Sequence, residues 1–209
     1  MYERWLAAEL DDADLKPELE SVKGDDAAIQ DRFAVALKFG TAGLRGVLGA
    51  GTNRMNIYMV RKATQGLANY LNKQGGKKSV AISYDSRIKS DVFAREAARV
   101  LAGNGVKAYL YKELMPVPAL SFATRHLHCD AGIMVTASHN PAIYNGIKVF
   151  TGGGRDADEV QTRDIERYIA RVDAAGIPRK RYEEAKKQGL VEEIYPMNEY
   201  IDGIMSKID

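Results

Sequence analysis

The fold is decided by residues 130–141, which read DAGIMVTASHNP. The segment from Gly132 to Val135 is entirely apolar, a pattern typical of a strand that is buried on both faces of a sheet. A polar turn that contains Ser138 follows directly, and a second short strand is predicted over residues 146–150. The turn is therefore expected at the carboxyl end of a central strand, where open α/β sheets bind their ligands.

Strands and helices alternate outward from this segment. Further strands are predicted over residues 79–84, 106–111 and 190–194. Apolar residues three or four positions apart predict helices over residues 57–71, 93–103, 118–127 and 157–172, and two more in the tail. In the helix over 157–172, Val160, Ile165, Tyr168 and Ile169 are expected to face inward. This alternation indicates a three-layer α/β/α fold around a mainly parallel, mixed sheet.

The first 36 residues differ from the rest in charge and pattern. Short helices are predicted over residues 1–33, with an apolar stripe at Trp5, Leu6 and Leu10. Residues 1–31 carry ten acidic and three basic residues, a net charge of −7, so the remainder carries +9. We expect a helical arm over residues 1–36 and a domain over 37–209. The mildly basic domain suits a small anion, but it lacks the dense basic stripe of a nucleic-acid binder.

The sequence disfavours both a secreted protein and a membrane protein. The N-terminus lacks the basic and apolar segments of a signal peptide, and no apolar run approaches the ~20 residues that cross a bilayer. A cytoplasmic protein without a membrane partner is therefore expected.

Cys129 is the single cysteine, which excludes an internal disulfide. With His126 and His128 it would make a poor zinc site, so a thiol in the core is the favoured interpretation.

The polar turn could carry nucleophilic chemistry. Ser138 should present an exposed hydroxyl, which needs a base, a metal or a cation to react. His139 and Lys148 are the candidate helpers, because Lys148 lies on the strand that returns from the turn. The alternative is that Ser138 caps a turn, Asn140 bonds its own backbone and Lys148 is a surface lysine.

Two further polar segments are expected near the same edge of the sheet. Residues 38–56 are rich in glycine, so their backbone is expected to turn sharply or to approach another group closely, and Arg45 in this loop could bind a phosphate with two hydrogen bonds. Asp85 and Arg87 are predicted to form an ion pair that supports the neighbouring loops. A Ser-His-Asp hydrolase is disfavoured because the Gly-x-Ser-x-Gly elbow is absent, and neither a phosphate-binding Walker loop nor a dinucleotide fingerprint is present.

Taken together, four segments resemble the α-D-phosphohexomutase family. They are FGTAGLRG at residues 39–46, DSR at 85–87, TASHNP at 136–141 and NGIKV at 145–149. The order and spacing of these motifs agree with the family over nearly all of the chain from about residue 37. The segment over residues 49–56 and the arm that contains Trp5 look most like the phosphoglucomutase branch.

The resemblance implies that Ser138 carries a phosphoryl group, donates it to a sugar monophosphate and recovers the other phosphate from a sugar bisphosphate intermediate. The expected reaction interconverts glucose 1-phosphate and glucose 6-phosphate, with the sugar 1,6-bisphosphate as intermediate or activator. Phosphopentomutase, phosphomannomutase, bisphosphate synthase and a stand-alone phosphosugar-binding module remain alternatives. The family residues match the following positions here: catalytic Ser138, His139, Lys148 and Arg45; substrate- or phosphate-binding Thr41, Asn140 and Arg45; supporting Asp85 and Arg87.

The resemblance also implies parts that this chain lacks. In the family a later Asp-Gly-Asp loop binds Mg²⁺, so Ser138 would be a metal ligand here only through its phosphate. Asp156-Ala157-Asp158 is the nearest imitation of that loop, but it stands at a predicted helix start, where acidic residues are expected anyway. We therefore expect the partners to be a phosphorylated sugar and the missing domains of the same polypeptide, and the isolated chain to be inactive.

Overall fold

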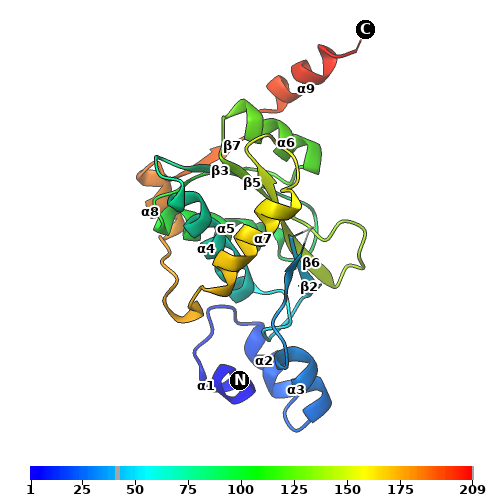
Figure 1. Cartoon of the computed structure of the whole chain (residues 1–209). Helices are drawn as coiled ribbons and strands as arrows, with labels where there is room; N and C mark the ends of the chain where they lie inside the picture. The colour runs from blue at the N-terminus through cyan, green and yellow to red at the C-terminus, as the bar shows by residue number, and fades with distance from the viewer. Residues whose placement is uncertain (41–42, 209) are drawn as a thin grey trace.

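A seven-stranded mixed sheet forms the centre of the computed structural model, which describes residues 1–40 and 43–208 (Figure 1). The order across the sheet is β1-β2-β6-β5-β3-β4-β7. The strands are β1 Phe39–Gly40, β2 Gly43–Val47, β3 Ser79–Tyr84, β4 Lys107–Tyr111, β5 Ala131–Val135, β6 Tyr144–Thr151 and β7 Val191–Ile194. Strands β5, β3, β4 and β7 pair in parallel, whereas β6 pairs antiparallel with β5, β2 with β6 and β1 with β2. The predicted α/β class with a mixed sheet is confirmed.

Helices cover both faces of this sheet. They are α1 Tyr2–Ala7, α2 Leu15–Ser21, α3 Asp26–Phe33, α4 Ile57–Lys73, α5 Ser90–Gly103, α6 Val117–His126, α7 Glu159–Ala170, α8 Tyr182–Lys187 and α9 Met197–Met205. Alternate residues of a strand point to opposite faces. Val80 and Ile82 accordingly join the core under α4, α5 and α7, while Ala81 joins the core under α6. The arrangement is the three-layer one predicted.

Local signals set the starts of several helices. Asn56 ends the loop before α4, and its side-chain oxygen accepts hydrogen bonds from the backbone N–H groups of Tyr58 and Met59. Asp158 begins α7 with a capping box, a role that agrees with its rejection as a metal ligand. The prediction that Val160 faces inward is wrong, since its side chain is 63% exposed. At about 100° per residue, Val160 lies on a different face from Ile165, which is buried.

The N-terminal helices pack around a small apolar cluster of their own. Buried Tyr2, Leu15 and Leu19 meet Ala50 of the glycine-rich segment. Trp5 packs edge-on against Tyr58 of α4, with ring centroids 5.1 Å apart. In Figure 1 these blue helices lie below the sheet, beside the end of β2. The prediction of short helices is confirmed, while the division of the chain at residue 36 stays a prediction.

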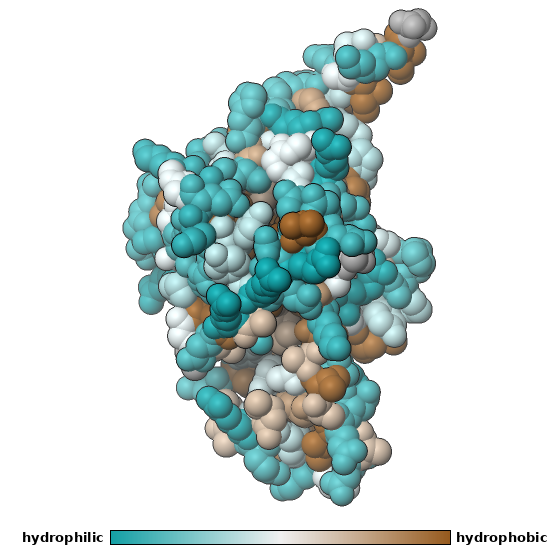
Figure 2. Space-filling model, in the orientation of Figure 1, coloured by the Kyte–Doolittle hydropathy of each residue, from teal (hydrophilic) through white to brown (hydrophobic). Residues whose placement is uncertain are grey.

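The last helix lies apart from the body of the sheet (Figure 1). Tyr200 of α9 contacts Phe122 of α6, with ring centroids 5.5 Å apart. Beyond that contact, Ile201, Ile204 and Met205 are exposed. Figure 2 shows brown, apolar residues on this projecting segment. Every described helix of the chain is too short or too polar to cross a lipid bilayer.

The Cys129 thiol is buried at the foot of β5, and burial raises its pKa to about 11. His126, by contrast, stacks on Phe122. Within the described residues, no three His, Cys, Asp or Glu side chains gather closely enough to hold a metal ion.

We predict that Cys129 of the folded chain reacts with iodoacetamide at pH 8 at least ~100-fold more slowly than in the urea-unfolded chain, because the thiolate is the reactive form. Reaction in both states is followed by intact mass. Equal rates would contradict the buried thiol.

Candidate active site

Ser138 lies in the loop that follows β5, where the sequence places it. Its side chain is exposed, and its backbone is left-handed, with φ of +54°. The Oγ1 atom of Thr136 accepts a hydrogen bond of 2.9 Å from the Ser138 N–H. Non-glycine residues rarely adopt this conformation, which costs on the order of 1 kcal/mol and occurs often at functional sites. The turn thus presents a serine hydroxyl to solvent at the carboxyl end of β5.

The side chain of Arg87 binds backbone carbonyl groups of this loop. One guanidinium nitrogen donates to the carbonyl oxygens of Ser138 at 2.6 Å and Asn140 at 2.7 Å. The other donates to those of Pro141 at 3.0 Å and Tyr144 at 3.1 Å. The prediction was that Asp85 and Arg87 support the loop as an ion pair. In the structure Arg87 also contacts the loop directly, because its side chain binds four of the loop's carbonyl groups.

A partly buried polar network contacts Arg87 in turn. Its Nε lies 3.4 Å from the carboxylate of Asp85, as predicted, and Asp85 also accepts from the hydroxyl of Ser90 at 2.9 Å. Asn145, which is buried, donates to the Ser90 hydroxyl and to the Ile88 carbonyl, both at 3.0 Å. Asn145 belongs to the NGIKV motif, but no role was predicted for it or for Ser90. An asparagine inside a strand is unfavourable, and that was the available signal.

Arg45 reaches the same loop from the other side. Its guanidinium donates to the side-chain oxygen of Asn140 at 2.7 Å, so Asn140 contacts both arginines. The turn expected around Arg45 is wrong, because residues Gly43–Val47 form strand β2, in which Arg45 lies opposite Gly146 of β6. The close approach that the glycines also allowed is found at Gly43. Gly43 has φ of +95°, and a side chain there would lie 1.9 Å from the carbonyl oxygen of Ile147, so glycine permits this close pairing.

The two predicted helpers of Ser138 are placed differently. Lys148 lies on β6, and its ammonium is 3.9 Å from the carboxylate of Asp156. His139 is exposed beside Ser138. Neither side chain forms a hydrogen bond or ion pair with Ser138 within the part of the chain that the structure describes. Thr41, the remaining predicted site residue, lies outside the described residues.

An open cavity of about 400 Å³ lies beside the Ser138 loop. It is lined by Asp85, Ser86, Arg87, Ile88, Ser138, Asn140 and Ala142. The Ser138 hydroxyl is exposed, and the guanidinium groups of Arg45 and Arg87 both contact its loop. This arrangement suits the binding and transfer of a phosphoryl group, which needs positioning and positive charge.

Comparison with known proteins places the chain in a family. Residues 36–176 match the family model described as phosphoglucomutase/phosphomannomutase, alpha/beta/alpha domain I. The phosphoglucomutase of Staphylococcus saprophyticus subsp. saprophyticus is 44% identical over 141 residues, which are 68% of this chain and 26% of that protein. That of Staphylococcus aureus strain bovine RF122 is 46% identical over 141 residues, 66% of this chain and 26% of that protein.

Solved structures agree with this match. A putative phosphomannomutase from Thermus thermophilus superimposes with a TM-score of 0.68 at 28% identity, over 84% of this chain and 37% of that one. Pp63/parafusin from Paramecium, at 21% identity and a TM-score of 0.67, shares the fold. This chain spans about a quarter of the length of the Staphylococcus relatives. The chain belongs to the phosphoglucomutase/phosphomannomutase family, in which it corresponds to the α/β/α domain I.

Proposed function

We propose that this chain is the phosphoserine-bearing domain of a phosphoglucomutase-type enzyme that interconverts glucose 1-phosphate and glucose 6-phosphate. The observation that carries the proposal is the Ser138 hydroxyl, exposed in a left-handed turn whose backbone is held by Arg87. Two phosphoglucomutases at 44% and 46% identity support the choice of reaction. The domain would act within a longer polypeptide, since those relatives are about four times as long as the segment they match.

In the proposed reaction, a hydroxyl oxygen of the sugar monophosphate attacks the phosphorus on Ser138. The bond between phosphorus and the serine oxygen breaks, and that oxygen takes the proton released by the sugar hydroxyl. After the sugar bisphosphate reorients, the serine oxygen attacks its other phosphate. The bond between that phosphorus and the sugar oxygen then breaks, and the freed sugar oxygen takes the proton of the serine hydroxyl. The two steps balance, and Ser138 ends phosphorylated again.

The chain's own residues would supply charge and position. Arg45 lies beside Asn140 and can neutralise a phosphoryl oxygen near Ser138. We assign proton transfer to His139, which is exposed next to the serine, and to Lys148 once its amine turns from Asp156 toward the loop. Thr41 and Asn140 would bind phosphate oxygens. Mg²⁺ would take its main ligands outside this chain, and we derive no step from it.

The substrate is tested in the complete polypeptide. We expect kcat/KM for glucose 1-phosphate to exceed that for mannose, ribose, deoxyribose and glucosamine phosphates by about 10-fold or more, because hydroxyl contacts discriminate sugars. A coupled assay across these sugars measures it. A higher value for another sugar would reassign the substrate. A coding sequence that stops at residue 209, together with tight phosphosugar binding by this chain without turnover, would instead favour a binding module.

A further inference from the structure

Lys89 joins the active-site turn to the N-terminal arm. It follows Arg87 by two residues and is left-handed, with φ of +63°, at the start of α5. Its ammonium lies 2.8 and 2.9 Å from the two carboxylate oxygens of Asp12, and 2.9 Å from the carboxylate of Asp14. The Asp12 side chain is 11% exposed, whereas that of Asp14 is 76% exposed. The Lys89 side chain is 24% exposed, so its pair with Asp12 is the better shielded from solvent and therefore the stronger of the two contacts.

The backbone around Lys89 is part of the support of the Ser138 loop. The carbonyl of Arg87 accepts a hydrogen bond from the Ser90 N–H, and that of Ile88 accepts from the side chain of Asn145. The left-handed conformation of Lys89 is intrinsically unfavourable and persists only where its surroundings hold it. Lys89 is only two residues from Arg87, whose guanidinium binds the loop.

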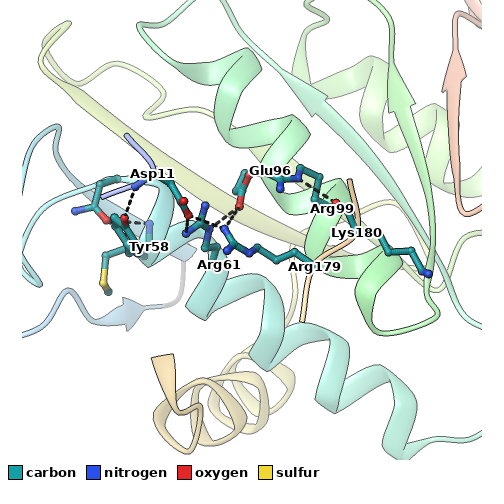
Figure 3. Close-up of polar contacts among 9 residues, drawn as sticks. Asp11, Tyr58, Arg61, Glu96, Arg99, Arg179 and Lys180 are labelled. Carbon is teal, nitrogen blue, oxygen red and sulfur yellow. Dashed lines mark hydrogen bonds and ion pairs between the residues drawn. The ribbon is translucent and has the colours of Figure 1, made fainter. Parts of the chain in front are cut away.

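Asp11, the residue before Asp12, ties the arm to the body of the domain. Figure 3 shows Asp11 directed at Arg61 of α4 and at Arg179 of the segment before α8, with Glu96 of α5 between the arginines. The distances from the Asp11 carboxylate to Arg61 and Arg179 are 2.7 and 2.8 Å. The guanidinium of Arg179 holds the pKa of Asp11 below its usual range. Asp12 therefore approaches Lys89 from a fixed backbone.

We propose that Asp12 and Lys89 are positioning residues for the active-site loop. Their ion pair ties the N-terminal arm to residues 85–90 and keeps Arg87 in place against the carbonyl groups that follow Ser138. Any catalytic consequence rests on the proposed function, but the positioning is measurable in this chain without substrate.

The test is amide hydrogen exchange, followed by NMR, in the chain with Asp12→Asn. The reporters are the Asn140 N–H, bonded to the Ala137 carbonyl, and the Tyr144 N–H, bonded to the Pro141 carbonyl. We expect both to exchange about 10-fold faster, because the loop opens locally more often. Asp12→Glu, which keeps the charge, should stay within about two-fold of the parent chain. Unchanged protection in Asp12→Asn would overturn the proposal.

Asp31→Asn is the matched control. Asp31 also joins the arm to the body through an ion pair, but its partner is Arg54, outside residues 85–90. Equal exchange of the two reporters in Asp31→Asn and Asp12→Asn would mean general loosening of the arm and would overturn the proposal. Lys89→Gln breaks the pair from the other side and should reproduce Asp12→Asn, so the test survives a folding defect in one variant. Because exchange needs no turnover, these outcomes are independent of whether Ser138 carries phosphate.

Discussion

Replacing Ser138 by alanine in the complete polypeptide is expected to reduce turnover of glucose 1-phosphate by roughly 10⁴-fold or more, the scale on which enzymes lose activity without their nucleophile. In the proposed reaction Ser138 both donates and accepts the phosphoryl group, and alanine has no oxygen to do either. The fold should be retained, because the side chain is exposed and the loop is held through its carbonyls. A coupled assay measures turnover, and intact mass measures the bound phosphoryl group.

Ser86 provides the comparison that makes this result specific. It is an exposed serine that lines the same cavity as Ser138. The Ser86→Ala variant is expected to keep the phosphoryl group, and peptide mapping should place that group on Ser138. Phosphate lost from Ser86→Ala but kept in Ser138→Ala would move the nucleophile to residue 86. Near-normal turnover by Ser138→Ala would remove the phosphoserine mechanism altogether.

The parts of the fold that follow from local sequence could be predicted well. The strand over Ser79–Tyr84 has the predicted bounds, and α4 begins at Ile57 as predicted, because both depend on neighbouring residues. Strand β2 could not be found in the same way. Its sequence, Gly43 to Val47, contains two glycines and has little intrinsic preference for a strand, so pairing with the distant β6 decides its structure.

In the site, too, features set by neighbouring residues could be predicted and those set by distant contacts could not. The apolar run before Ser138 was enough to place the hydroxyl at the end of β5. The contacts of Arg87 could not be foreseen, because backbone carbonyls occur at every residue and give no signal in a sequence. The position of Lys148 on β6 was predicted, whereas the contact of its ammonium with the carboxylate of Asp156 depends on the fold and gives no signal in the sequence.

Replacing Arg87 by methionine should be the most damaging change outside the nucleophile. It removes hydrogen bonds to four carbonyl groups, from a side chain that is 14% exposed. We expect the free energy of unfolding to fall by about 2 kcal/mol, since hydrogen bonds from charged donors are among the stronger ones. Turnover should fall by about 100-fold, the cost of misplacing a reacting group by about 1 Å. Urea unfolding and the coupled assay measure the two effects.

Two further arginine variants separate the causes of that loss. Arg163→Met removes an arginine of α7 whose side chain is 65% exposed, and it should change the unfolding free energy by no more than about 0.5 kcal/mol. Arg87→Lys keeps the charge but replaces the planar fork by a single ammonium, which cannot hold four carbonyls in one arrangement. We expect it to recover part of the stability and little of the turnover. Full recovery of turnover by lysine would mean that positive charge alone is required at residue 87, and that the geometry of the guanidinium does not set the position of Ser138.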